Sequence, residues 1–219
     1  MFICTVEDQR WLRTRWHALM MRLSVERMAA ATAWDALVHR YCEPHRAYHN
    51  LSHILALLRH MEAVSAHVCN RDAVELTIWF HDVIYDTHAA DNEEQSAAFA
   101  RRTMQTLGIA PILISPVEDC ILATKKHEVS SPDIADQPTF LDMDLAILGA
   151  REEVYRRYAQ AIRAEYGWVP ADEYKKGRSQ VLNRFLARPA LFFTHTMAAQ
   201  FEIAARKNIE QELQELPTL

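Results

Sequence analysis

The stretch RAYHNLSHILALL, residues 46–58, places His49 and His53 four positions apart in an apolar segment. WFHDVIYD, residues 79–86, follows with a third histidine directly before an aspartate. Residues four positions apart share one face of a helix, unless His49 lies on the turn just before it. Imidazole and carboxylate groups are costly to bury unless something pairs with them, and a metal ion is one such partner. The two stretches therefore predict apolar helices that bring polar groups together.

The composition favours an all-helical protein. Of 219 residues, 50% are hydrophobic and 24% are charged, which suits a globular chain with one sizeable core. Only four glycines occur, so few sites exist for tight hairpin turns, whereas the good helix formers Ala, Leu, Glu, Arg and Met recur throughout. We find no internal repeat and no flexible linker. We expect one all-α domain over residues 1–219.

Apolar periodicity, helix caps and helix breakers together predict where the helices lie. The segment EVSSPDIADQP, residues 128–138, is the longest stretch of turn-forming residues and is predicted to be a mobile loop. A break is expected at Gly149 inside the helix that follows this loop. The predicted helices are approximately 7–23, 26–41, 50–67, 72–85, 92–107, 116–127, 140–165, 171–187 and 190–214.

Charge and cysteine usage limit the partners and the compartment. The formal net charge is −5 and no long Lys/Arg run occurs, so the electrostatic pattern of a nucleic-acid binder is missing. The cysteines are scattered without a CxxC pair, which suits a reducing compartment. The N-terminus lacks a secretion-signal pattern, and no apolar run approaches the roughly 20 residues that span a bilayer. We expect a cytoplasmic protein that binds neither duplex nucleic acid nor a membrane.

Two further carboxylates, Asp142 and Asp144, lie in the apolar stretch FLDMDLAILG, residues 140–149. Two imidazoles and two carboxylates would suit a divalent ion such as Mn, Fe, Co, Ni or Zn, with Mg a further choice, and would leave positions open for water and a substrate oxygen. A set of this kind is formed by His53, His81, Asp82 and Asp144. A lone histidine is more often a hydrogen-bonded core residue, and an HD dipeptide arises by chance, but the combination is a stronger signal.

The order of these motifs resembles the HD-domain superfamily of metal-dependent phosphohydrolases. The wider pattern is similar to a subfamily of predicted HD phosphohydrolases whose substrates are mostly undefined, and the similarity covers nearly the whole chain. The motifs are YHNLSH (48–53), FHDVIYD (80–86), DNEEQSA (91–97), ATKKH (123–127), LDMDLAILG (141–149), IRAEYGWV (162–169) and GRSQVLNRFL (177–186).

This resemblance implies a compact HD-domain helical bundle with additional N- and C-terminal helices. It also implies metal ligands at the matching positions, with Asp144 preferred and Asp142 as the rival for the fourth place. The implied ligands are His53, His81, Asp82 and Asp144.

The YHN-xx-H string further resembles the first motif of cyclic-nucleotide phosphodiesterases. That resemblance implies that His49 is a general acid, a role that the near-neutral pKa of histidine suits. A hydrogen-bonding role beside the site is the alternative. His127 and His88 are candidates for a second metal, with His127 the better placed, although His127 could equally bind substrate phosphate or cap a helix.

Glu93 and Glu94 could orient a water or a histidine, or they could favour the helix dipole from the first turn. Arg163, Lys126 and Arg178 are candidate cations for a substrate phosphate, although each residue type is more often found at a surface.

The favoured hypothesis is therefore hydrolysis of a phosphate ester, either a nucleotide or another small phosphorylated metabolite. Asp82 would accept a proton from the attacking water, and His49 or a water would protonate the leaving group. One alternative is an HD-type oxygenase with two irons, which would need His127 and a further histidine such as His88. Another is a non-catalytic helical module that binds a ligand. The sequence leaves open whether the protein forms a homodimer.

Overall fold

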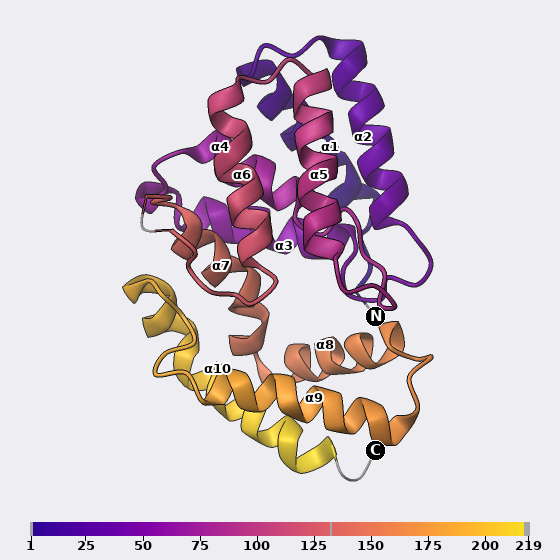
Figure 1. Cartoon of the computed structure of the whole chain (residues 1–219), viewed down its shortest axis with the longest axis vertical. Coiled ribbons are helices and arrows are strands. Elements are labelled where there is room, and N and C mark those ends of the chain that lie inside the picture. The colour runs from indigo at the N-terminus through magenta and orange to yellow at the C-terminus, as the bar shows by residue number, and fades with distance from the viewer. Residues whose placement is uncertain (1, 132, 217–219) are drawn as a thin grey trace.

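The computed structural model describes residues 2–131 and 133–216, and within these residues it is all-helical, as predicted, with no β-strand (Figure 1). None of the described helices has both the length and the apolar composition that a bilayer crossing requires. The helices are α1 (Val6–Arg22), α2 (Arg27–Tyr41), α3 (Leu51–Ala63), η1 (Ser65–His67), α4 (Arg71–Phe80), α5 (Asn92–Thr106), α6 (Pro111–Ala123), α7 (Gln137–Leu145), η2 (Ala146–Gly149), α8 (Glu152–Glu165), α9 (Ala171–Leu186) and α10 (His195–Glu215), where η1 and η2 are 3₁₀ helices.

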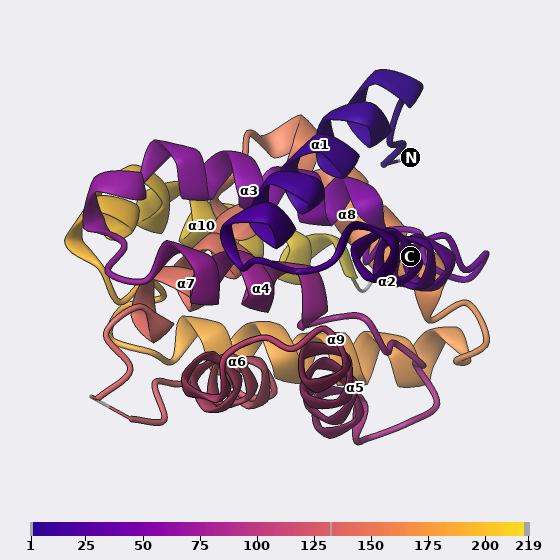
Figure 2. The same ribbon diagram turned by 90° about the horizontal axis from the view of Figure 1, so that it is seen from above.

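The helices form two groups. In Figure 1, α1 to α6 make up the upper part of the molecule, α8 to α10 lie across its lower end, and α7 leads from one group to the other. α5 and α6 pack side by side, and α10 packs on η2, α8 and α9. Figure 2 shows the same arrangement from above, with α9 running beneath the ends of α5 and α6. The loops and helix ends at the seam between the two groups carry the predicted site.

Helix α4 lies at the centre of the upper group. All of its residues from Ala73 to Phe80 are buried, which explains its nearly unbroken apolar sequence. The ring of Trp79 packs edge-on against Trp16 and Trp34, with centroids 5.6 and 5.8 Å apart. Because these residues are surrounded by core, the C-terminal end of α4 is held in place where it meets the seam.

Two helix ends place predicted site residues. The Asn50 side chain accepts a hydrogen bond from the backbone N–H of Ser52 and so starts α3 at Leu51. His49 therefore lies on the turn before the helix, which is one of the two predicted placements. α4 ends at Phe80 and not near residue 85: the N–H of Val83 turns back to the carbonyl of Phe80, and the N–H of Ile84 donates to the Ser96 hydroxyl in place of a helical partner.

Other boundaries also differ from prediction. α6 begins at Pro111, where a missing N–H has no cost, and Pro116 lies inside this helix. The predicted helix 140–165 is divided into α7, η2 and α8, because the backbone turns to an extended conformation at Ala150. The last helix starts at His195, where the Thr194 side chain caps it.

Candidate metal centre

His53, His81 and Asp82 come together at the seam, and each offers a ligand atom within 4.8 Å of the others. His53 lies in the first turn of α3 and His81 is the C-terminal cap of α4. Their Nε2 atoms are 3.1 Å apart, and Nε2 of His81 is 3.1 Å from Oδ2 of Asp82. Adjacent residues on a helix would point about 100° apart, but the chain leaves the helix at His81, which lets both side chains reach one point.

Asp144 in the last turn of α7 completes the set. Its Oδ1 lies 3.2 Å from Nε2 of His53 and 3.6 Å from Nε2 of His81. The structure thus brings all four residues implied by the resemblance to one place, and we call them the His/Asp cluster (His53, His81, Asp82 and Asp144). Asp142 is not brought there: its carboxylate accepts the backbone N–H groups of Phe193 and Thr194 and the Thr194 hydroxyl before α10.

The orientation of His81 is fixed by a hydrogen bond outside the cluster. Its Nδ1–H donates to the backbone carbonyl of Ile78, 3.0 Å away in the last turn of α4. Carbonyls in a last turn lack helical partners, so this contact satisfies an otherwise open acceptor. With Nδ1 holding a proton, Nε2 of a neutral His81 presents its lone pair to the cluster, as in metal-ligating histidines.

The cluster attracts positive charge. Burial disfavours the charged form of His81, but Asp82 and Asp144 outweigh burial and raise its pKa well above the usual value. Burial lowers the pKa of His53, so this ring stays neutral, and its Nδ1 has no hydrogen-bond partner. Without an ion, the facing Nε2 atoms must share one proton. A metal ion can take the place of that proton because both rings and both carboxylates already point at it.

The cluster is open to solvent on its carboxylate side. The side chains of His53 and His81 are 2% and 1% exposed, whereas those of Asp82 and Asp144 are 21% and 11% exposed. The two imidazole rings therefore lie at the buried side of the cluster, and a ligand would approach from the side of the carboxylates.

His127 approaches the cluster from the turn that follows α6. Its Nε2 lies 2.9 Å from Oδ2 of Asp144, the oxygen that does not face the other two histidines. The residue has a φ of +48°, and Arg188 holds this turn by donating to the carbonyls of His127 and Lys126. His127 is thus placed to orient Asp144, and the same position would let the two side chains share a second ion.

His49 is held by Glu165 at the end of α8. Oε2 of Glu165 lies 2.7 Å from Nδ1 of His49, and Oε1 accepts the backbone N–H groups of Tyr48 and His49. The Tyr85 hydroxyl also donates to this carboxylate, and the Tyr85 ring stacks on His49 with centroids 4.2 Å apart. The His49 ring lies 5.8 Å from the ring of His53, next to the His/Asp cluster. Burial opposes the charged form of His49, but Glu165 raises its pKa above the usual value.

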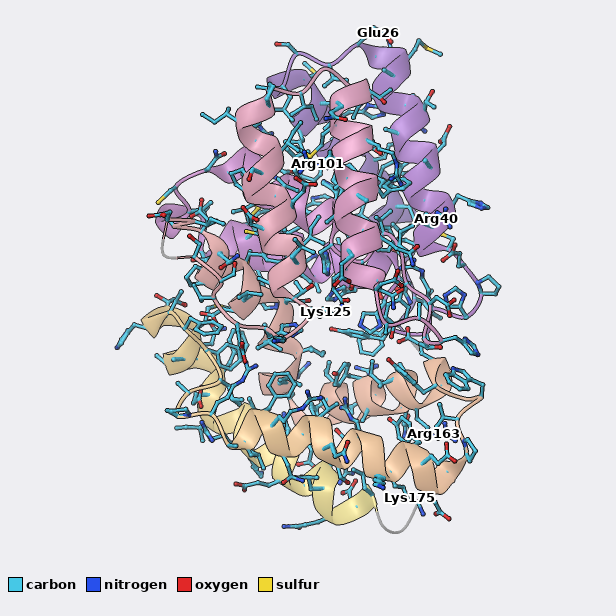
Figure 3. The ribbon with its side chains drawn as sticks, viewed as in Figure 1. Glu26, Arg40, Arg101, Lys125, Arg163 and Lys175 are labelled. Atoms are coloured by element: carbon cyan, nitrogen blue, oxygen red, sulfur yellow. The ribbon has the colours of Figure 1, made fainter. Side chains whose placement is uncertain are left out.

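The two predicted arginines are engaged in the lower group. Arg163, which Figure 3 labels in the lower group, donates to the carbonyls of Tyr166 and Val169, and its guanidinium lies over the ring of Tyr174 on α9. Arg178 is buried and makes two hydrogen bonds to Glu212 on α10, at 2.7 and 3.0 Å. Both guanidinium groups thus hold helices of the lower group together.

The remaining predicted residues lie around the seam. Glu93 and Glu94 lie in the first turn of α5, where Glu94 pairs with Lys125, a residue that Figure 3 shows at the lower end of α6. Lys126 is exposed. His88 is in the exposed loop before α5, where its Nδ1 lies 3.0 Å from a carboxylate oxygen of Asp86.

Sequence reasoning missed two residues that shape the site. Glu165 lies in the quoted motif IRAEYGWV, but it is 116 positions from His49, and nothing local shows that the two meet. Arg46 opens the quoted stretch RAYHNLSH; it is buried and donates to the carbonyls of His49 and Asp82, which ties the two histidine-bearing turns together. Its position just before the YHNLSH motif is the sequence signal that could have identified it.

Comparison with known proteins adds no family assignment: no family model, no curated protein and no solved structure matches the chain. The HD-domain resemblance therefore stays a prediction that depends on the motifs and on the geometry of the His/Asp cluster.

Proposed function

We propose that the protein is a metal-dependent phosphohydrolase of the HD type that acts on the phosphate ester of a small metabolite. The observation that carries this proposal is the His/Asp cluster, in which two imidazole nitrogens 3.1 Å apart and two carboxylates face one point. This is a donor set of two nitrogens and two oxygens from three separate segments, open to solvent on one side.

The donor set fits a divalent ion of intermediate hardness such as Mn, Fe, Co, Ni or Zn, and Mg is the harder alternative. When bound, such an ion polarises a phosphoryl oxygen and lowers the pKa of water toward neutrality. His53 and His81 would supply the nitrogens, and Asp82 and Asp144 the oxygens. If Nε2 of His53 binds the ion, its proton lies on Nδ1, which is buried without a hydrogen-bond partner, unlike Nδ1 of His81.

His49 is proposed to protonate the leaving oxygen. Glu165 holds Nδ1, which leaves Nε2 as the proton donor beside the cluster. Glu165 raises the pKa of His49, which favours the protonated ring that a general acid requires. Asp82, with a carboxylate that is partly exposed, is proposed to accept a proton from the attacking water.

A second ion is the main variant of this proposal. The contact between His127 and the outer oxygen of Asp144 favours it, because one carboxylate could then serve two ions. An oxygenase with two irons would need one more histidine, and the predicted His88 is instead paired with Asp86 in an exposed loop. This pairing favours hydrolysis over oxygen chemistry.

The test combines elemental analysis with a panel of phosphate esters. We expect freshly purified protein to contain about one or two equivalents of a transition metal, and chelation to remove both the metal and the turnover. Adding back single divalent ions should restore turnover. Protein that binds no ion, or that hydrolyses esters equally well after chelation, would contradict the proposal. Tight binding of one metabolite without turnover would favour the non-catalytic module.

A further inference from the structure

Tyr48 lies directly against the His/Asp cluster. Its ring centroid is 5.0 Å from the ring centroid of His53 and 5.0 Å from that of His49, and the residue is only 6% exposed. Among the described residues none hydrogen-bonds to the Tyr48 hydroxyl, and its oxygen is not closed off from solvent. A buried ring thus presents an unpartnered hydroxyl beside the proposed ligands.

Other buried tyrosines of this protein use their hydroxyls within the fold. Tyr41 donates to the backbone carbonyl of Trp79 at 3.0 Å, and Tyr155 donates to the carboxylate of Glu212. A buried tyrosine hydroxyl usually has such a partner, because leaving a donor unsatisfied costs free energy. The Tyr48 hydroxyl is therefore available to a group from outside the chain.

Three contacts hold Tyr48 in place. Its backbone N–H donates to Oε1 of Glu165 at 2.6 Å. The rings of Tyr158 and Phe2 meet the Tyr48 ring edge-on, with centroids 4.7 and 5.2 Å away. A donor that is fixed before a ligand arrives needs no reorganisation when it binds, which makes its hydrogen bond more effective.

The surroundings of the Tyr48 hydroxyl suit a neutral donor to an anion. A phenol keeps its proton at neutral pH, and burial raises the pKa of this one well above its ordinary value, with the carboxylates of Asp144 and Asp82 acting in the same direction. The arginines predicted to meet a substrate phosphate, Arg163 and Arg178, are engaged in the lower group. A phosphate at the cluster therefore needs donors other than these two.

We propose that the Tyr48 hydroxyl donates a hydrogen bond to a non-bridging oxygen of the substrate phosphate at the His/Asp cluster, which makes Tyr48 a further catalytic residue. This inference rests on the proposed hydrolase function. A hydrogen bond to a charged oxygen is stronger than one between neutral groups. It would offset part of the negative charge that the phosphate brings next to the carboxylates of Asp82 and Asp144.

The first test is Tyr48→Phe, which removes the hydroxyl and keeps the ring. We expect kcat/KM for a phosphate ester to fall by about 10- to 100-fold while the metal content stays unchanged. Because the lost hydroxyl has no partner among the described residues, the denaturation midpoint should stay the same or rise. Tyr155→Phe is the matched control, because its buried hydroxyl is hydrogen-bonded outside the cluster. It should lower the midpoint and leave kcat/KM within about twofold.

Binding of inorganic phosphate separates failure of this inference from failure of the hydrolase proposal. Titration calorimetry on metal-loaded protein should give a phosphate affinity about tenfold weaker in Tyr48→Phe than in the wild type, and unchanged in Tyr155→Phe. Weaker phosphate binding in a protein that hydrolyses no ester would overturn the hydrolase and keep the phosphate contact.

Three results would overturn the phosphate contact. The first is a Tyr48→Phe protein with unchanged turnover and unchanged phosphate affinity, which would keep the hydrolase. The second is loss of metal from Tyr48→Phe, because the hydroxyl would then support the ion and not the substrate. The third is wild-type protein that binds no phosphate.

Discussion

Helix α4 and its C-terminal cap carry two buried ionisable groups whose surroundings differ in kind. Near its start, the side chain of Glu75 is 0% exposed and meets two cations from α1, with 2.6 Å to Nη2 of Arg22 and 3.3 Å to Nη2 of Arg15. At its end, His81 enters the His/Asp cluster, where ring nitrogens and carboxylate oxygens face one another and, among the described residues, no arginine or lysine takes part. Glu75 is neutralised by fixed partners of the protein.

This difference in partners distinguishes a buried charge that stabilises the fold from a cluster that is suited to binding an ion. Both arrangements carry the cost of removing polar groups from water. Around Glu75 the protein supplies the opposite charge from a neighbouring helix, so the group holds α1 against α4. In the His/Asp cluster the compensating charge must come from a proton or an ion. Mutations should therefore affect stability at one end of α4 and metal binding at the other.

The largest effect is expected at the cluster. His53→Ala removes a nitrogen ligand and should reduce both metal content and turnover, the latter on the order of 10³-fold. His60→Ala is the matched control, because it makes the same change seven positions along α3 and outside the cluster. Metal content by elemental analysis and kcat/KM on a phosphate ester should separate the two variants. Equal metal content in both would show that the cluster does not hold the ion.

The reverse pattern is expected at Glu75. Glu75→Gln leaves the guanidinium groups of Arg15 and Arg22 without their buried counter-charge and should lower the free energy of unfolding by about 3 kcal/mol. Glu62, the other partner of Arg15, has a side chain that is 46% exposed. Glu62→Gln should therefore lower the free energy of unfolding by less than about 1 kcal/mol. Denaturant unfolding measures both. A loss of metal in Glu75→Gln protein that remains folded would mean that the two ends of α4 are not independent.

A substitution at Glu165 tests whether a carboxylate that is fully hydrogen-bonded within the protein also contributes to catalysis by positioning His49. Glu165→Gln weakens the hold on His49 and should lower kcat on the order of 10²-fold for esters with poor leaving groups, with less effect on nitrophenyl esters, which need no protonation. Glu165 raises the pKa of His49, and a general acid loses activity as the pH rises through its pKa. In Glu165→Gln protein the activity should therefore begin to fall at a lower pH, as the pH is raised, than in the wild type. An unchanged pH profile and an equal loss for both ester types would indicate a purely structural role.

The sequence allowed prediction of site residues that lie in short motifs, but not of contacts between residues far apart in the chain. The proposed ligands His53, His81 and Asp82 lie in short motifs, so their convergence needs only that α3 and α4 pack together. Asp142 and Asp144 are two positions apart, so on a helix their side chains point about 160° apart and only one can face the cluster; the packing of α7 places Asp144 there, the residue that the resemblance preferred. Glu165 is fixed by the docking of α8, which no local pattern encodes.

The smallest effect on stability is expected for a solvent-exposed hydrogen-bond network at the start of α1. At the start of α1, Thr5 and Asp8 form a capping box in which the hydroxyl of Thr5 accepts the N–H of Asp8, and the carboxylate of Asp8 accepts the N–H of Thr5. Thr5→Ala should lower the free energy of unfolding by about 1 kcal/mol. Thr14→Ala, on the same helix and exposed, should change it by less than about 0.5 kcal/mol.

The capping box also has a defined pH dependence. Hydrogen bonds from the side chain and backbone of Thr5 lower the pKa of Asp8 in the folded protein. Its contribution is therefore fully present above the unfolded pKa of about 3.9 and is lost as the pH falls through the lower folded value. The difference in stability between wild type and Thr5→Ala should then shrink between pH 5 and the acid limit of folding. A constant difference over that range would mean that the hydroxyl acts alone, and that even at the surface the carboxylate contributes nothing to the cap.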